Sequence, residues 1–283
     1  MKTKLIDYVD NGPIFITGHV NPDGDALGSA FALKLFLDSQ NIISDVDFDI
    51  TTKLPSNLNH LPYHLISDDL KEKYNTVFVF DCGNSSRLGK YEEVVLAAEN
   101  IVVIDHHVDP SFGDVQIIDP HAASTTQVLF RQFKDENIEI NEEMANCLLT
   151  GLITDTGRFQ YSNTTSEVFS IAAELLGNGA NLSKISENIY GSIEFNALTL
   201  QSKIIERIVL NEDLQFAHSI VFQNDYKDYQ VEPEETDFLI DVVRLVKEST
   251  VALLIKEQED GSFKGSLRSV SYTHLRAHET MLH

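Results

Sequence analysis

Tryptophan is absent from this 283-residue chain, and cysteine occurs only twice, as Cys82 and Cys147. Two cysteines so far apart cannot form a disulfide framework, and they lack the spacing of a zinc ribbon. Cys82 could act as a thiolate ligand or nucleophile, but a small core residue is the favoured interpretation for both.

Long apolar runs are also missing. No stretch of about 18 consecutive apolar residues occurs, which excludes a membrane-spanning helix. The acid-containing N-terminal segment lacks the apolar centre of a signal peptide. Because 42% of the residues are hydrophobic and 23% are charged, the chain can bury a core and is not disordered. We therefore expect a cytoplasmic protein with no membrane partner.

Cations are scarce, since 21 Lys and Arg face 44 Asp and Glu, for a net charge of −23. Affinity for long nucleic acid depends on many contacts between Lys or Arg and phosphates. Long duplex nucleic acid is therefore excluded as a partner. A small phosphorylated substrate remains compatible if a few cations or bound metal ions offset the acids, and the acidity also favours solubility.

The first half of the chain alternates short apolar strands with helical segments. Strands are expected at 13–17, 44–50, 76–80, 101–104 and 115–118, and helices at 26–38, 123–134 and 142–153. Such an alternation favours right-handed crossovers and a parallel sheet with helices on both faces. The predicted fold class is α/β.

The second half predicts a helical stretch followed by a smaller α/β domain. Helical periodicity runs over 166–210, with glycine interruptions after residue 176 and at Gly191. Beyond it, the pattern predicts strands at 214–220, 251–256 and 262–268 and a helix at 234–247. Asp260-Gly261 marks a turn between the last two strands.

The C-terminal residues 271–283 (SYTHLRAHETMLH) fit no element and hold three of the ten histidines. A His-rich metal tract is one explanation, and translated sequencing-adapter DNA is the favoured one. The predicted organisation is a catalytic domain at 1–185, a helical linker at 186–210, an incomplete second domain at 211–270 and a non-native tail at 271–283.

Acids and histidines follow the ends of the predicted strands. The first strand leads into H-x-x-x-D-x-D-x-x-G-S, the third ends at an aspartate, and the fourth ends in Asp-His-His. Open parallel sheets bind ligands outside the carboxyl ends of their strands, so these residues should converge in one crevice. A further aspartate after an apolar helix can reach it. The candidate metal ligands are His19, Asp23, Asp25, Asp81, His106 and Asp155.

Clustered carboxylates repel one another unless protons or cations offset their charge. Carboxylates with neutral imidazoles and no thiolate favour Mn²⁺ or Mg²⁺. The set exceeds what one tetrahedral ion needs, so two ions sharing a carboxylate is the economical interpretation. Two such ions about 3.5–4 Å apart clamp the attacking and leaving oxygens of a phosphoryl displacement.

Taken singly, each of these residues has an ordinary structural role. The run 21–25 could be a simple turn, Asp81 and Asp105 could be helix N-caps, and Asp155 could pair with Arg158. The metal site is favoured because independent turns and caps do not require all of these residues to follow strand ends in one α/β unit.

Together, these motifs resemble those of the DHH phosphoesterase superfamily, which includes RecJ exonucleases, family II pyrophosphatases, cyclic-dinucleotide phosphodiesterases and nanoRNases. The segment 149–164 (LTGLITDTGRFQYSNT) is most similar to the nanoRNase and pAp-phosphatase, NrnA-type branch. The resemblance implies an N-terminal DHH domain, a DHHA1-like second domain and a dimanganese centre between them, with Mg²⁺ as the other candidate ion.

The resemblance also implies which residues hold each ion. The first Mn²⁺ is assigned to His19, Asp23 and Asp81. The second is assigned to Asp25, Asp81, His106 and Asp155, so that Asp81 bridges the pair.

The same resemblance assigns catalytic roles to His107, Asp105 and Asp81. His107 would contact the scissile phosphate, and Asp105 would orient the histidine pair. A hydroxide bridging the metal ions at Asp81 would be the nucleophile, since coordination acidifies water.

Substrate contacts are expected from four residues. Arg158 is a candidate bidentate phosphate contact, with an ion pair to a nearby acid as the alternative. Ser124 and Thr125 begin a predicted helix and could bind an anion or simply cap it. Arg268 matches the strand before the family's Gly-Gly-Gly-His segment, and that segment does not follow here.

The resemblance implies hydrolysis of short single-stranded oligoribonucleotides to mononucleotides and removal of the 3′-phosphate of pAp. A cyclic-di-AMP or pApA phosphodiesterase is the alternative, and a family II pyrophosphatase fits the 149–164 segment less well. The alternative from another class is a nucleotide- or phosphate-binding module without catalysis. A homodimer is compatible with each of these functions.

Overall fold

The computed structural model describes residues 4–9, 12–51, 53–108, 110–191, 193–236, 238–269 and 279–282. The chain forms two compact units, residues 1–190 and 191–283. Among the helices in these described ranges, none is long and apolar enough to cross a membrane.

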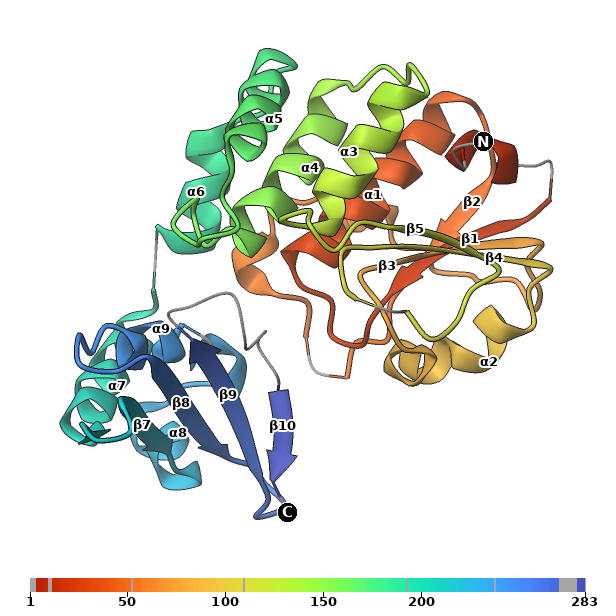
Figure 1. Ribbon diagram of the computed structural model, residues 1–283. Coiled ribbons are helices and arrows are strands. Elements are labelled where there is room, and N and C mark those ends of the chain that lie inside the picture. The colour runs from red at the N-terminus through yellow and green to blue at the C-terminus, as the bar shows by residue number, and fades with distance from the viewer. Residues whose placement is uncertain are drawn as a thin grey trace. The chain divides into compact units, whose positions relative to one another are not determined.

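The first unit is built on a five-stranded sheet in the order β2-β1-β3-β4-β5, and every neighbouring pair is parallel (Figure 1). The strands are β1 (Ile14–Gly18), β2 (Ser44–Val46), β3 (Thr76–Phe80), β4 (Asn100–Asp105) and β5 (Val115–Ile118). The predicted strands are confirmed, although the expected 44–50 strand is paired only as far as Val46.

Helices cover both faces of this sheet, as the apolar strands predict. The helices α1 (Gly24–Ser39), α3 (Thr125–Asp135) and α4 (Glu142–Asp155) pack on one face, and α2 (Glu92–Leu96) lies on the other (Figure 1). Alternate residues of a strand serve the two cores, so Ile14 and Ile16 face α1 while Phe15 packs with Tyr91. The α/β fold class is confirmed.

A close helix–helix crossing fixes α1 against α4. A Cβ atom added to Gly28 would lie 2.4 Å from the carbonyl oxygen of Cys147 on α4. The glycine of the sequence motif therefore allows close packing between two helices. Both cysteines are buried, and Cys147 lies in this core.

Two further helices, α5 (Ser166–Gly177) and α6 (Leu182–Tyr190), complete the first unit. They occupy the first part of the expected helical stretch. Helix α5 packs on α4 and α3, and α6 contacts α4.

The second unit contains a mixed sheet in the order β10-β9-β8-β7-β6. Only β7 and β8 are parallel. Its strands are β6 (Val209–Asn211), β7 (Phe216–Val221), β8 (Val251–Glu257), β9 (Phe263–Ser269) and β10 (Glu279–Leu282). Its helices are α7 (Phe195–Glu206), α8 (Gln223–Tyr229) and α9 (Leu239–Arg244). Gly261, with φ at +80°, forms the expected turn before β9.

Some expected boundaries in the second unit were wrong. Val209 begins strand β6 instead of continuing a helix, because it pairs with His218 of β7. The helix expected at 234–247 is a 3₁₀ turn followed by the short α9. Part of the expected irregular tail, 279–282, pairs with β9 as β10, while 271–278 and 283 lie outside the described residues.

Candidate metal centre

The site begins where three neighbouring strands end together. Gly18 of β1 is in register with Phe80 of β3, and Phe80 is in register with Ile104 of β4. The next residues along the chain are therefore brought to one edge of the sheet: His19, Asp81 and Asp105-His106. This is the convergence that the strand-end pattern predicts.

Asp23 and Asp25 reach the same edge from the start of α1. Asp23 is the N-cap, and its side chain accepts hydrogen bonds from the backbone N–H groups of Asp25 and Ala26 at 3.0 and 3.1 Å. The turn and the cap are therefore real, and they coexist with the proposed ligand role. The Asp23 side chain is 55% exposed, so this side of the cluster is open to solvent.

Two groups of donor atoms share Asp81. His19 Nε2 lies 3.6 Å from Asp81 Oδ2 and 3.9 Å from Asp23 Oδ1. On the other side, His106 Nε2 lies 3.7 Å from Asp81 Oδ1. His107 Nδ1 lies 3.2 Å from the same Oδ1 atom. Oδ2 of Asp81 therefore faces His19, while Oδ1 faces His106 and His107.

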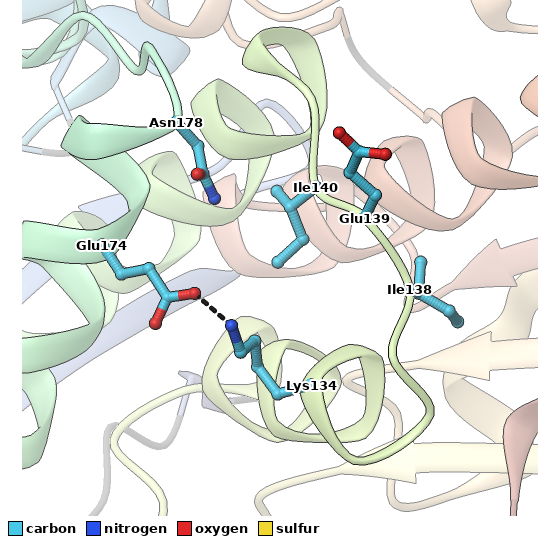
Figure 2. A pocket seen from close by; sticks show the side chains of 6 residues that line it. All are labelled: Lys134, Ile138, Glu139, Ile140, Glu174 and Asn178. Carbon is cyan, nitrogen blue, oxygen red and sulfur yellow. Dashed lines mark hydrogen bonds and ion pairs between the residues drawn. The ribbon is translucent and has the colours of Figure 1, made fainter.

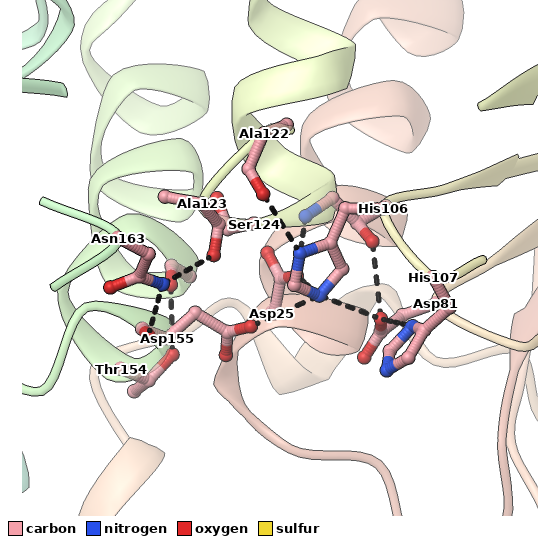
Figure 3. A network of polar contacts seen from close by, with 12 residues as sticks. Asp25, Asp81, His106, His107, Ala122, Ala123, Ser124, Thr154, Asp155 and Asn163 are labelled. Atoms are coloured by element: carbon pink, nitrogen blue, oxygen red, sulfur yellow. Dashed lines mark hydrogen bonds and ion pairs between the residues drawn. The ribbon is translucent and has the colours of Figure 1, made fainter. Parts of the chain in front are cut away.

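The second group is completed by Asp155 and Asp25. His106 Nε2 lies 3.3 Å from Asp155 Oδ2 and 3.9 Å from Asp25 Oδ2 (Figure 3). Among the described residues, three sets have donor atoms that lie within 4.8 Å of one another. Two are His19, Asp23 and Asp81, and Asp25, His106 and Asp155; the third joins Asp81 and His106 to Asp105 and His107. All six candidate ligands belong to the first unit.

His107 stands beside these groups and is held by Asp105. Asp105 is fully buried, and its Oδ1 accepts hydrogen bonds from the backbone N–H of His107 at 2.9 Å and from the His107 ring Nδ1 at 2.6 Å. His106 Nδ1 instead bonds the carbonyl of Ala122 at 3.3 Å. Asp105 thus orients one ring of the pair, while the loop before α3 orients the other.

Nearby carboxylates raise the pKa values of His19, His106 and His107. Burial disfavours the charged imidazolium of His106, yet contacts with Asp155, Asp25 and Asp81 outweigh it and raise its pKa to about 10. His107 is likewise opposed by burial but raised to a pKa of about 9 by Asp105 and Asp81. Burial also opposes protonation of His19, and Asp23 and Asp81 raise its pKa well above the usual value.

Two carboxyl groups of the cluster, Asp25 and Asp155, hold their protons more strongly than usual. Burial, with the nearby charges of Asp155 and Asp81, raises the pKa of Asp25 well above its usual value. Burial raises the pKa of Asp155 to about 6, and His106 only partly offsets this. A buried cluster of oxygen and imidazole donors that attracts protons this strongly fits a divalent cation of the Mn²⁺ or Mg²⁺ type.

The first residues of α3 donate hydrogen bonds to Asp25 and Asp81. Asp25 accepts hydrogen bonds from the backbone N–H groups of Thr125 and Thr126 at 2.6 and 2.9 Å. Thr125 Oγ1 donates to Asp81 Oδ1 at 3.1 Å, and Ser124 Oγ caps the helix by accepting from the Gln127 N–H. Ser124 and Thr125 are buried by these contacts, so their role as substrate contacts stays a prediction.

The other two expected substrate contacts lie elsewhere. Arg158 is exposed, and its guanidinium stacks 3.9 Å above the ring of Tyr190, the last residue of α6. Arg268 lies on β9 in the second unit, where its guanidinium bonds the Leu267 carbonyl. Cys82 donates its thiol to the Asn84 carbonyl, and burial raises its pKa to about 12, which disfavours a thiolate.

Several contacts of the cluster could not be expected from residue types. The carbonyls of Ala122 and Ala123 and the amides at the start of α3 act through backbone groups, which nearly all residue types share. Asn163, which bonds the carbonyls of Ala123 and Asp155, lies in the segment that carries the family resemblance, but no feature of the sequence indicates its partners.

A hollow of about 190 Å³ elsewhere in the first unit lacks these features (Figure 2). Lys134 and Glu174 form an ion pair across it. Its lining residues are Lys134, Ile138, Glu139, Ile140, Glu174 and Asn178. Its only lysine is already paired with Glu174. The lining contains no histidine or aspartate, unlike the strand-end cluster.

Comparison with known proteins agrees with the geometry. The model of the DHH family, N-terminal domain, matches residues 13–152. The chain is 32% identical over 267 residues to the bifunctional oligoribonuclease and PAP phosphatase NrnA of Thermus thermophilus, covering 91% of this chain and 76% of that protein. The NrnA protein of Bacillus subtilis is 28% identical, covering 75% of this chain and 68% of that one.

A solved structure shares the fold over nearly the whole chain. An exopolyphosphatase-related protein from Bacteroides fragilis superposes with a TM-score of 0.87 at 26% identity, covering 94% of this chain and 82% of that one. The matched family region contains five of the six candidate ligands, and the sixth, Asp155, follows it closely. This chain belongs to the DHH phosphoesterase family, in its NrnA-type branch.

Proposed function

We propose that this protein hydrolyses phosphate esters of short oligoribonucleotides, releasing mononucleotides, and removes the 3′-phosphate of pAp at a centre for two Mn²⁺ ions. The observation that carries this proposal is the Asp81 carboxylate, whose two oxygens face His19 and His106 separately. A carboxylate in that position suits a bridge between two ions. The names of the Thermus and Bacillus relatives support the substrate class.

The candidate ligands fall into two groups, one on each side of Asp81. His19 and Asp23 complete the donor set on one side of Asp81, and Asp25, His106 and Asp155 on the other. Divalent ions bound there supply positive charge to phosphoryl oxygens and acidify water. The opening at Asp23 and His107, whose side chains are 55% and 33% exposed, gives a phosphate access to the centre.

His107 is suited to bind or protonate a substrate oxygen. Its Nδ1 is held by Asp105 at 2.6 Å, which fixes the ring and directs Nε2 toward a ligand. With no cation bound, Asp105 and Asp81 raise the pKa of the ring to about 9 against the effect of burial. A protonated imidazole can stabilise negative charge on the phosphate and donate a proton to a leaving oxygen.

The net charge of −23 agrees with a very short substrate. Long nucleic acid would require many basic contacts, whereas a substrate of a few nucleotides needs only metal ions and a handful of cations. Arg158 remains our candidate for a contact beyond the metal centre, because it is exposed and follows Asp155 closely in sequence.

Assays with Mn²⁺ on a diribonucleotide, pAp and cyclic-di-AMP test this proposal. Asp81→Ala should abolish turnover and lower the bound metal together, because both groups lose a donor. His107→Ala should retain metal and reduce kcat by about 10²–10⁴-fold. The exposed residues Asp68 and His64 supply matched controls as Asp68→Ala and His64→Ala, with activity expected near that of the wild type.

Inactivity of the wild-type chain on all three substrates, with Mn²⁺ bound, would favour a binding module instead. Preference for cyclic-di-AMP would replace the proposed substrate class. Loss of metal in His107→Ala would mean that the roles of the two histidines are misassigned.

A further inference from the structure

The C-terminal end of α4 leaves a backbone carbonyl without its helical partner. In a continuing helix the N–H of Phe159 would donate to the carbonyl of Asp155. Here that N–H donates to Thr156 Oγ1 at 3.2 Å, because the chain turns away through Gly157, Arg158 and Phe159 with φ of 54°, 62° and 63°. Two consecutive non-glycine residues in the left-handed region are unfavourable, and such strain collects at functional sites.

The side chain of Asn163 replaces the missing donor. Its Nδ2 donates to the Asp155 carbonyl at 3.1 Å and to the Ala123 carbonyl at 3.2 Å (Figure 3). A side-chain amide carries two N–H bonds, so it can serve both acceptors at once. The end of α4 is thereby joined to the loop that precedes α3, 40 residues away in sequence from Asn163.

That loop also orients the histidine facing Asp155. The carbonyl of Ala122 accepts from His106 Nδ1 at 3.3 Å, which leaves Nε2 directed at Asp155 Oδ2, 3.3 Å away. Adjacent carbonyls of one loop thus hold His106 directly and Asp155 through Asn163. The two candidate ligands come from different elements, β4 and α4, so their spacing depends on this connection.

We infer that Asn163 is a positioning residue for the half of the centre formed by Asp25, His106 and Asp155. Its amide fixes the backbone of Asp155 against the loop that orients His106. The other half, with His19 and Asp23, depends on the ends of β1 and α1, whereas the Asn163 amide donates to the end of α4 and to the loop before α3. This inference rests on the proposed two-ion function, and it adds a residue outside the ligand set.

The test measures Mn²⁺ binding by the full chain with titration calorimetry and electron paramagnetic resonance. Asn163→Asp preserves the shape but replaces both donors with a carboxylate facing two carbonyls, and Asn163→Ala is a milder second variant. Loss of a group that supports a metal ligand typically weakens affinity by about 10–100-fold. We expect that loss for one ion, an unchanged Kd for the other, and loss of the resonance signature of a coupled ion pair.

Asn146 provides the matched control. It also makes two hydrogen bonds, donating to the Glu142 carbonyl and accepting from the Asn181 N–H, both at 2.9 Å, and it lies toward the other end of α4. Asn146→Ala should keep both Mn²⁺ affinities.

Unchanged affinities in both Asn163 variants would overturn the inference, and so would equal weakening of both ions, which would indicate a general loss of structure. A wild-type chain that binds no divalent ion would instead overturn the proposed function, and this inference with it.

Discussion

The close crossing of α1 and α4 gives a prediction with a sign that can be worked from the structure. In Gly28→Ala, the new Cβ would lie 2.4 Å from the carbonyl oxygen of Cys147, whereas real Cβ atoms essentially never approach closer than 3.0 Å. The overlap is at least 3.0 − 2.4 = 0.6 Å. The atom it meets is backbone in a buried helix, so no side-chain rotation relieves the contact and the two helices must separate.

The expected cost follows from two opposing effects. Overpacking of a core costs about 1–3 kcal/mol, and replacing a helical glycine with alanine returns up to about 1 kcal/mol of helix propensity. We therefore expect Gly28→Ala to lower the free energy of unfolding by about 1–2 kcal/mol. Gly177→Ala is the matched control, because nothing lies within 4 Å of its added Cβ. Since Gly177 is the last residue of α5, the substitution should raise stability by less than about 1 kcal/mol.

Urea unfolding followed by far-ultraviolet circular dichroism measures both variants against the wild type. Equal denaturant slopes would show that the shift in midpoint reports stability. If Gly28→Ala is as stable as Gly177→Ala, the crossing does not constrain the helices and the argument from close approach is refuted.

Two other substitutions probe the first unit. Gly151→Ala would place a Cβ 2.7 Å from Asp25 Oδ1 and push that carboxylate away from the backbone N–H groups of α3. Mn²⁺ affinity, measured by calorimetry, should therefore fall by about tenfold. An unchanged affinity would show that Asp25 tolerates the shift. Burial and then the charge of Lys184 lower the pKa of His60 from 6.5 to about 4, so the unfolded chain binds more protons than the folded chain between these pH values and stability falls as the pH falls. Because His60 is only partly buried, we expect wild type to lose about 1–2 kcal/mol more than His60→Gln between pH 6.5 and pH 4; parallel urea-midpoint curves for the two proteins would contradict this.

The sequence predicts the sheet of the first unit well because its physical signal is local. The run Thr76–Phe80 (TVFVF) is apolar after its first residue and buried throughout, as a strand covered on both faces requires. Once the strands are parallel, the polar residues that follow them must share one edge of the sheet. The grouping of His19, Asp81 and His106 follows from that topology.

The supporting contacts could not be predicted in the same way. Asp25 is held by N–H groups 100 and 101 residues away, and any residue except proline at those positions would supply the same backbone donor. The interaction of Asn163 depends on the turn after Asp155. Two non-glycine residues of that turn have positive φ angles, in the left-handed region. In the second unit, Val209 became a strand residue through pairing with His218, a tertiary effect that outweighs helical periodicity.

The central claim is that Asp81 joins two cation sites. Crystals grown with Mn²⁺ and measured at the manganese absorption edge should show two anomalous peaks about 3.5–4 Å apart, one beside His19 and one beside His106, both within ligand distance of Asp81. A single peak, or peaks that do not share Asp81, would contradict the account.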